Sequence, residues 1–159
     1  MKASIVVLIM AGICQPVFAD ECQFDQEARV ERNIQLKEKY PGSYLIENNL
    51  VLVVPVAEGR VEITIGGCEH YGVSVELKTK IGTKYQSESE LMALIVRLAR
   101  SYSQGIVDTN ILERVIKEKQ WMQPGPPRAY LLNYEDEATF EVYVWRDDET
   151  YVFGFNYYS

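Results

Sequence analysis

Apolar and polar residues alternate along two separate blocks of this chain, and this alternation limits the possible folds more than any other feature. The blocks cover residues 50–78 and 129–158. Successive side chains of a β-strand point to opposite faces, so alternation predicts strands that bury one face and expose the other. Between the blocks, apolar residues recur at a helical spacing instead. These patterns predict an α+β domain built around an antiparallel sheet.

The first block predicts three strands. A two-residue turn at Glu58-Gly59 places apolar residues opposite one another in three pairs, Val56/Val61, Val54/Ile63 and Leu52/Ile65. Pro55 lacks the backbone N–H that a ladder needs, so we expect residues 50–56 to be an edge strand or to contain a bulge. The third strand is indicated by Val73, Val75 and Leu77, which alternate with polar residues.

Three helices are predicted. Residues 23–40 are highly charged and precede a Pro-Gly stop, which favours a helix with a ragged apolar stripe. Ser87 and Glu90 have the spacing of a capping box, which begins a second helix. This helix is apolar over most of its circumference, so we expect it to be the core helix, with a buried stripe of Leu91, Leu94, Ile95, Leu98 and Tyr102. A third, amphipathic helix is expected over residues 110–120.

The second block predicts three more strands, over residues 129–134, 138–145 and 150–158. A four-residue loop at 146–149 forms the pairs Val144/Tyr151, Val142/Phe153 and Phe140/Phe155, and these define the core face. The other face then carries Glu141, Tyr143, Trp145, Val152 and Tyr158. The expected order is therefore α-βββ-αα-βββ, with about six strands and the helices on one face of the sheet.

The first nineteen residues have the pattern of a secretory signal peptide. Lys2 precedes an apolar run, and Val-Phe-Ala at 17–19 supplies small residues for cleavage after Ala19. Lipidation at Cys14 is disfavoured, because Ile13 stands where Gly, Ala or Ser normally precedes a lipidated cysteine. We therefore expect a periplasmic or secreted protein, with one domain over residues 20–159. No later apolar run reaches membrane length, so no integral membrane segment is expected after cleavage.

Removal of the signal leaves two of the three cysteines, Cys22 and Cys68. An even number of cysteines in an oxidising compartment favours pairing, so one disulfide is expected. Closing so long a loop stabilises the fold by about 4 kcal/mol in the chain-entropy treatment. A nucleophilic role for Cys68 is correspondingly disfavoured.

The charge of the chain limits its partners. The precursor has 16 basic and 23 acidic residues and a net charge of −7, and loss of Lys2 with the signal changes this to −8. Nucleic acids and anionic membranes repel an acidic protein, so neither is expected as a partner. The charge is compatible with a basic partner protein.

Few residues support catalysis or metal binding. The chain has one histidine, His70, and no G-x-S-x-G nucleophile elbow. One histidine and two paired cysteines do not make a structural zinc site. The acidic runs at 135–137 and 147–149 lack the spacing of a calcium loop and resemble solvated hairpin turns. No catalytic residue, metal or cofactor is therefore predicted, although paired carboxylates for glycoside cleavage stay open.

Two groups of residues are candidates for binding. The segment GGCEHYG, residues 66–72, frames Glu69, His70 and Tyr71 with glycines beside the expected disulfide, which would anchor the loop at its base. Tyr143 and Trp145 share the face opposite Phe140, and such side chains give large, stiff contact area. A stable but functionless turn, or a second face covered by other segments, would also explain these patterns.

The expected function is that of an exported, non-enzymatic binding protein. Small acidic exported domains with one disulfide include inhibitors of lysozyme-like enzymes and immunity proteins against secreted toxins, an analogy of size and compartment only. We therefore expect a periplasmic inhibitor or immunity protein for a basic, cell-wall-directed enzyme or toxin. The alternatives are a small carboxylate-dependent hydrolase and a small-ligand or envelope-assembly binding module.

Overall fold

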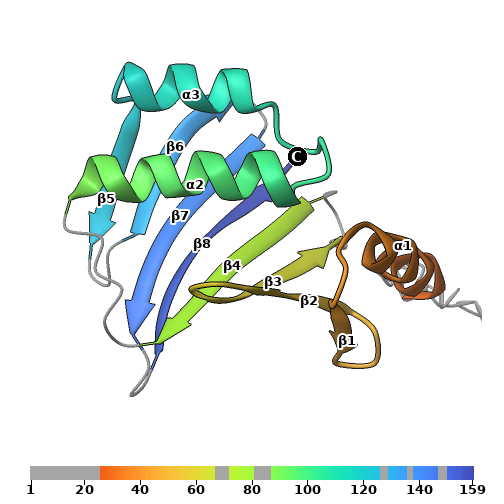
Figure 1. Ribbon diagram of the computed structural model, residues 1–159. Coiled ribbons are helices and arrows are strands. Elements are labelled where there is room, and N and C mark those ends of the chain that lie inside the picture. Colours follow the sequence, from red (N-terminus) through yellow and green to blue (C-terminus); the bar gives the residue numbers. More distant parts are fainter. Residues whose placement is uncertain (1–25, 67–71, 81–86, 126–128, 136–137, 147–149) are drawn as a thin grey trace, which may run out of the picture.

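The computed structural model describes residues 26–66, 72–80, 87–125, 129–135, 138–146 and 150–159. These residues form one antiparallel sheet of eight strands and three helices, which confirms the α+β prediction (Figure 1). In chain order the elements are α1 (Gln26–Lys39), β1 (Tyr44–Ile46), β2 (Val51–Val56), β3 (Gly59–Ile65), β4 (Gly72–Lys80), α2 (Glu88–Tyr102), α3 (Thr109–Lys117), β5 (Trp121–Gly125), β6 (Ala129–Glu135), β7 (Ala138–Arg146) and β8 (Thr150–Tyr158).

The sheet consists of two four-stranded meanders joined through their last strands. Its order is β1-β2-β3-β4-β8-β7-β6-β5, so β4 and β8 lie at the centre and the two first strands lie at the edges. β4 pairs with β8 along its whole length, from Gly72 opposite Tyr158 to Lys80 opposite Thr150. Each meander follows one or two helices along the chain. The central pairing places the polar side chains of β3 and β4 near those of β7.

The expected number of about six strands was too low, because both edge strands were missed. β1 has only three residues, which is too short for a pattern of alternation. β5 contains Pro124, and the proline-rich stretch around it favoured a loop. An edge strand tolerates proline because one side of its backbone needs no partner. Pro55 led to the prediction of an edge strand, but β2 is an inner strand. Pro55 is tolerated there because β1 pairs only with Val51–Val53, so Pro55 lies beyond the part of β2 that pairs with β1.

Both predicted hairpin registers were wrong by two residues, and in both the buried face was nevertheless correct. Val54 lies opposite Val61 rather than Ile63, because the turn lies at 57–58. Val144 lies opposite Phe153 rather than Tyr151. A shift of two residues leaves every side chain on its original face, since the period of a strand is two. Alternation therefore defined the faces but not the turns.

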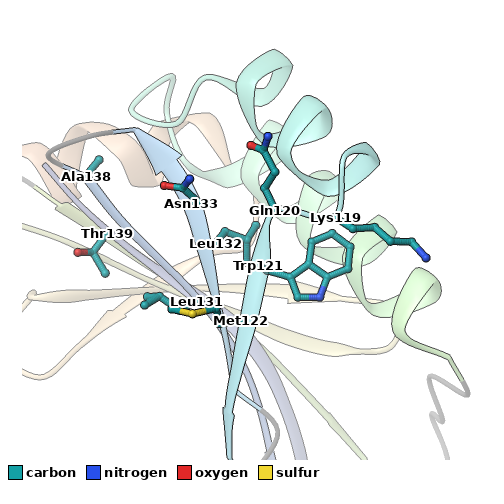
Figure 2. Close-up of a pocket in the computed structure, with 9 residues that line it drawn as sticks. All are labelled: Lys119, Gln120, Trp121, Met122, Leu131, Leu132, Asn133, Ala138 and Thr139. Atoms are coloured by element: carbon teal, nitrogen blue, oxygen red, sulfur yellow. The ribbon is translucent and has the colours of Figure 1, made fainter.

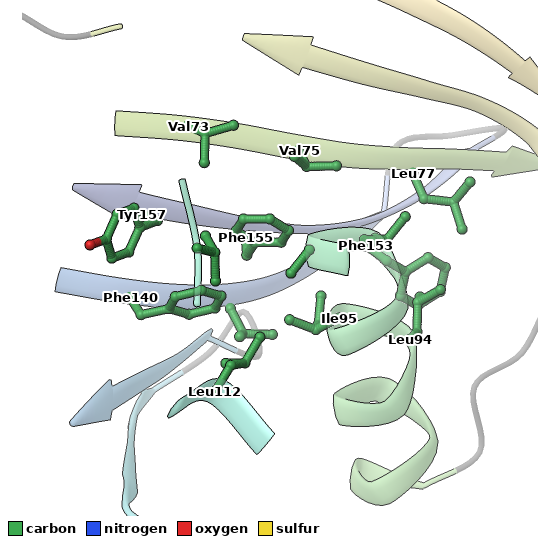
Figure 3. Packing of buried hydrophobic residues seen from close by; sticks show 14 of the residues in the cluster. Val73, Val75, Leu77, Leu94, Ile95, Leu112, Phe140, Phe153, Phe155 and Tyr157 are labelled. Atoms are coloured by element: carbon green, nitrogen blue, oxygen red, sulfur yellow. The ribbon is translucent and has the colours of Figure 1, made fainter. Parts of the chain in front are cut away.

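The core lies between one face of the sheet and the helices α2 and α3 (Figures 1 and 3). The capping box is present: the Glu90 N–H donates to the Ser87 hydroxyl, and the Ser87 N–H donates to the Glu90 carboxylate. The predicted stripe of α2 is buried, except that Tyr102 is half-buried. Phe140 and Phe155 stack with ring centroids 5.1 Å apart, beneath the side chains of the two helices. The predicted placement of these two helices on one face is thus confirmed.

α1 packs at the β1–β2 end of the sheet (Figure 1). Leu36 joins the core cluster, whereas Ile34 is 47% exposed, as a ragged stripe would suggest. Two polar side chains join the helix to the sheet: Arg29 Nε donates to the carbonyl of Ile65 at the end of β3 at 3.0 Å, and the Asn33 amide donates to the carbonyl of Asn49 in the turn between β1 and β2 at 2.8 Å. Polar contacts therefore supplement a small apolar contact.

Several expectations concern residues outside the described ranges. These are the signal peptide at 1–19, the Cys22–Cys68 disulfide, and the loop residues Glu69, His70 and Tyr71, so all stay predictions. In the part of the chain that the structure describes, no helix has the length and hydropathy needed to cross a bilayer.

Candidate functional site

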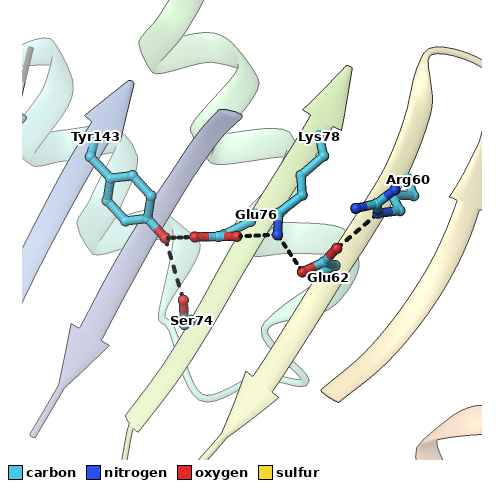
Figure 4. Close-up of polar contacts among 6 residues, drawn as sticks. All are labelled: Arg60, Glu62, Ser74, Glu76, Lys78 and Tyr143. Atoms are coloured by element: carbon cyan, nitrogen blue, oxygen red, sulfur yellow. Dashed lines mark hydrogen bonds and ion pairs between the residues drawn. The ribbon is translucent and has the colours of Figure 1, made fainter. Parts of the chain in front are cut away.

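The sheet face opposite α2 and α3 carries a continuous group of polar side chains, which we call the polar face. It is formed by Arg60 and Glu62 on β3, Ser74, Glu76 and Lys78 on β4, and Tyr143 on β7 (Figure 4). One cross-strand row unites three strands: Tyr143 is paired with Gly154, and Gly154 with Glu76. Because β8 contributes a glycine to this row, nothing on β8 separates the side chains of its two neighbours.

Tyr143 extends over Gly154 to reach β4. Its hydroxyl donates a hydrogen bond to Glu76 Oε1 at 3.0 Å, and the Ser74 hydroxyl lies 3.4 Å from the Tyr143 hydroxyl oxygen. A Cβ added at Gly154 would lie 2.8 Å from both Cζ and Oη of Tyr143. Burial, with the negative charge of Glu76 adding to it, holds the pKa of Tyr143 far above its ordinary value. The hydroxyl is therefore a neutral donor throughout the physiological pH range.

A chain of ion pairs continues from Glu76 across β4 and β3. Lys78 Nζ lies 3.3 Å from Glu76 and 2.6 Å from Glu62, and Arg60 Nε lies 2.8 Å from Glu62. Glu62 and Glu76 are directly opposite residues in adjacent strands, an arrangement that like charges would make unfavourable. Lys78 lies between the two carboxylates and removes that repulsion.

Burial alone would raise the pKa of Glu62, but hydrogen bonds from Lys78 and Arg60 outweigh it and hold that pKa below its ordinary value. Burial alone would likewise lower the pKa of Lys78, and its contacts with Glu62 and Glu76 raise it instead. Both groups are therefore charged at neutral pH. A general acid of a glycoside hydrolase needs a carboxyl whose pKa is raised, and Glu62 has the opposite tuning.

An open hollow of about 680 Å³ adjoins the basic end of this chain of ion pairs. Its lining consists of Tyr44, Pro55, Gly59, Arg60, Lys78, Thr79, Lys80 and Thr150. Tyr44 at the edge of the sheet is 46% exposed. The hollow has a volume typical of small-ligand sites, although it opens widely to solvent.

The structure places Tyr143 and Trp145 on one face of β7, as alternation predicted. Their situations differ, because the Tyr143 hydroxyl is engaged by Glu76, whereas Trp145 is 39% exposed. Trp145 is paired with Val152, which is paired in turn with Lys78. Trp145 therefore flanks the ion pairs, and of the two aromatic residues it has more surface free for a partner. Their binding role stays a prediction.

The structure describes Gly66 and Gly72 at the two ends of the candidate binding loop, but not Glu69, His70 and Tyr71 within it. The Gly66 N–H donates to the Gly72 carbonyl at 2.9 Å, which brings the two ends of the loop together. Gly66 has a φ of 114°, a conformation that favours glycine. At Gly72 an added Cβ would lie 2.5 Å from the Tyr157 carbonyl oxygen, so only glycine fits at the position where the chain re-enters the sheet.

A second hollow, of about 590 Å³, lies at the β5 edge beside the C-terminal end of α3 (Figure 2). Met122 and Leu131 are opposite one another in β5 and β6, and their exposed fractions are 67% and 36%. Lys119 and Trp121 line both this hollow and a further one of about 530 Å³, which is also lined by residues of α2 and α3. Among the residues that the structure describes, neither hollow is lined by Tyr143 or Trp145.

Sequence reasoning missed Arg60, Glu62, Ser74, Glu76 and Lys78, because alternating polar residues normally indicate only a solvated strand face. A signal was nevertheless present in Gly154, which interrupts an apolar and aromatic strand. An interior strand glycine often marks a place where another side chain approaches closely. Among the described residues, no three His, Cys, Asp or Glu side chains gather as metal ligands.

Comparison of the chain with protein-family models, curated proteins and solved structures gave no match.

Proposed function

We propose that this chain is an exported, non-enzymatic binding protein that inhibits or neutralises a basic, cell-wall-directed enzyme or toxin. The proposal combines the signal-peptide pattern of residues 1–19 and the net charge with one structural observation. That observation is the exposed Trp145, which lies beside a polar face whose side chains are already fixed by hydrogen bonds and ion pairs.

A rigid aromatic residue beside ordered polar groups suits protein recognition. A tryptophan gives a large contact area with few rotatable bonds, so little conformational entropy is lost when it binds. Ion pairs that are ordered in the free protein do not have to be ordered on association. We infer that Trp145 is the central contact and that the polar face forms its surroundings.

The carboxylate-dependent hydrolase is the weaker alternative. The structure does bring two partly buried carboxylates together, Glu62 and Glu76, with side-chain exposures of 12% and 24%. Lys78 bridges both, however, and the pKa of Glu62 is lowered rather than raised. A lowered pKa keeps Glu62 ionised at neutral pH, so Glu62 is not suited to donate a proton to a leaving group.

The partner should be basic, because the mature chain carries a net charge of −8. Opposite net charges accelerate encounter, and the acceleration declines as salt shortens the screening length below about 8–10 Å. Association should therefore slow with added salt, while dissociation changes less.

The decisive experiment uses the mature chain, residues 20–159, as bait for an envelope extract, followed by binding and inhibition assays with each purified partner. Trp145→Ala should weaken the affinity at least about tenfold, as is typical of a central contact. Ile34→Ala is the matched control, because Ile34 is an exposed apolar residue on α1. Equal affinities of the two variants would place the contact elsewhere, and a partner that is a neutral glycan or an assembly factor would favour the small-ligand or envelope-assembly binding module.

The loop at 69–71 is tested separately. If the loop enters a cleft of the partner, simultaneous replacement of Glu69, His70 and Tyr71 by alanine should weaken the affinity for that partner. Unchanged thermal melting shows that the fold is intact. An affinity within about twofold of the parent would exclude the loop and leave Trp145 as the better candidate.

A further inference from the structure

We propose that the hollow between β2, β3, β4 and β8 is an anion-binding site, which accepts a carboxylate or phosphate group of a small ligand. The proposal does not rest on the function proposed above, since it concerns a different chemistry. It follows from the charge of the lining residues, from the contacts that hold two of them in position, and from the volume of the hollow.

The described lining residues have the opposite charge to the protein as a whole. The chain has more acidic than basic residues, yet the described residues that line this hollow include three cationic side chains, Arg60, Lys78 and Lys80, and no carboxylate. The strands produce this concentration of charge: Arg60 is paired with Lys78 across β3 and β4, and Lys80 follows two residues later on the same face of β4.

Two of the cations are held in position without losing all their donors. Arg60 uses its Nε–H for Glu62, which leaves the terminal N–H groups of its guanidinium. Lys78 has three N–H donors and lies near two carboxylates. Glu62 thus acts as a brace that orders both cations, so that an incoming anion meets donors that are already oriented.

The carboxylates that neighbour the cations also limit the affinity of the site for an anion. Glu62 and Glu76 offset two of the three positive charges, and the hollow is open to water, where screening weakens ion pairs. We therefore expect weak binding that salt suppresses. The same reasoning predicts an unusual variant: Glu62→Gln should bind the anion more tightly, because it removes the nearest competing negative charge while its amide oxygen can still accept a hydrogen bond from one of the two cations.

The remaining lining residues favour a ligand larger than a bare ion. The volume of about 680 Å³ exceeds what one phosphate needs. Tyr44 supplies an exposed ring and Thr150 a hydroxyl at the margin of the hollow. An aromatic ring beside cations fits a sugar or similar ring that bears a carboxylate or phosphate.

The test is a titration of the mature protein, followed by amide NMR, with inorganic phosphate, with glucuronate and with neutral glucose. Saturable shifts confined to residues near Tyr44, Lys80 and Thr150 are expected with both anions but not with glucose. Tighter binding of glucuronate than of phosphate would identify an acidic sugar, and the reverse would identify phosphate itself.

Variants distinguish a site from general ionic effects. Lys80→Gln and Arg60→Gln should each weaken binding about fivefold, and Glu62→Gln should strengthen it by a similar factor, the scale expected for one charge at close range near a surface. Lys37→Gln, an exposed lysine on α1, is the control and should bind as the parent does. Linear, unsaturated shifts, or equal affinities in all four variants, would overturn the proposal; thermal melting confirms that each variant is folded.

Discussion

Tyr143 covers Gly154 on the neighbouring strand, so that its hydroxyl reaches past β8 to Glu76 on β4. The missing side chain at Gly154 is what permits this contact, and the tyrosine ring in turn covers backbone that glycine leaves exposed. Three strands are joined by one side chain at the centre of the sheet, where the two four-stranded meanders meet.

Gly154→Ala should destabilise the protein by about 1–3 kcal/mol, the usual range for overpacking. The new methyl group would lie 2.8 Å from the Tyr143 ring and 2.8 Å from the Val75 carbonyl oxygen. Denaturant unfolding in the parent and in a Tyr143→Ala background measures the two contributions. If the ring is the obstacle, the cost is smaller when Tyr143 is already alanine, and an equal cost in both backgrounds would assign the clash to the backbone alone.

Tyr143→Phe should cost about 1 kcal/mol of unfolding free energy, because it removes the donor to Glu76 while it keeps the ring over Gly154. Tyr44→Phe is the matched control, since Tyr44 is an exposed edge-strand tyrosine, and it should change stability by a few tenths of a kcal/mol at most. Urea unfolding curves decide the matter, and equal changes in both variants would mean that the Tyr143 hydrogen bond contributes no net stability.

The fold was largely predictable from periodicity, and the errors have identifiable physical origins. Alternation identified the buried faces of β2, β3, β4, β7 and β8 because burial depends on the face and not on the register. It failed at the two edges, where β1 is short and β5 contains Pro124. Hairpin register depends on which residues make the turn. Gly59 favoured a turn at Glu58-Gly59, but Gly59 is the first residue of β3, so the predicted register was shifted.

The site was predictable only in part. Tyr143 and Trp145 were identified because alternation places both on the face opposite Phe140, and such side chains give large, stiff contact area. The residues that fix Tyr143 were not, because Glu76 lies far from it in sequence and meets it only through the β4–β8 pairing. β4 and β8 are separated along the chain by two helices and three strands, so no local sequence pattern indicates that they pair. The polar contacts that depend on this pairing could therefore not be predicted from either strand alone.

The buried stripe of α2 predicts where truncation is costly. Leu94 and Leu98 are each 4% exposed, so Leu94→Ala and Leu98→Ala should each cost about 2–5 kcal/mol. Arg97 lies on the exposed side of the same helix, and Arg97→Ala should cost far less. Chemical denaturation of the three variants provides the comparison, and similar losses at all three positions would contradict the assigned orientation of α2.

The expected disulfide is open to a direct chemical test. The exported protein, denatured without reductant, should show no reactive thiol after the signal peptide is removed, because Cys22 and Cys68 are expected to be bonded. The double variant Cys22→Ser/Cys68→Ser should lose stability by an amount of about 2–4 kcal/mol. Two titratable thiols in unreduced material would refute the pairing, and with it the idea that the loop at 69–71 is anchored at its base.

The ion pairs of the polar face should make stability depend on acid pH in a way that one substitution can isolate. Lys78 and Arg60 hold the pKa of Glu62 below its ordinary value of 4.5, whereas in the unfolded chain this carboxyl has lost both partners. The unfolded chain therefore takes up the proton at higher pH than the folded one. The stabilising effect of Glu62 is complete above about pH 5 and disappears as pH falls through the lowered folded value.

Urea unfolding at pH 6 and pH 3 measures this contribution. The parent should lose more stability between the two pH values than Glu62→Gln, which has no carboxyl to protonate at this position. Lys78→Met should also reduce the difference, because Lys78 is a principal cause of the lowered pKa. Glu113→Gln serves as the control, since Glu113 pairs with Arg100 on the exposed surfaces of α2 and α3, and it should retain the pH dependence of the parent. If Glu62→Gln retained it as well, the bridge between Glu62 and Lys78 would contribute nothing to acid sensitivity, and the brace that we assign to Glu62 in the anion site would lose its support.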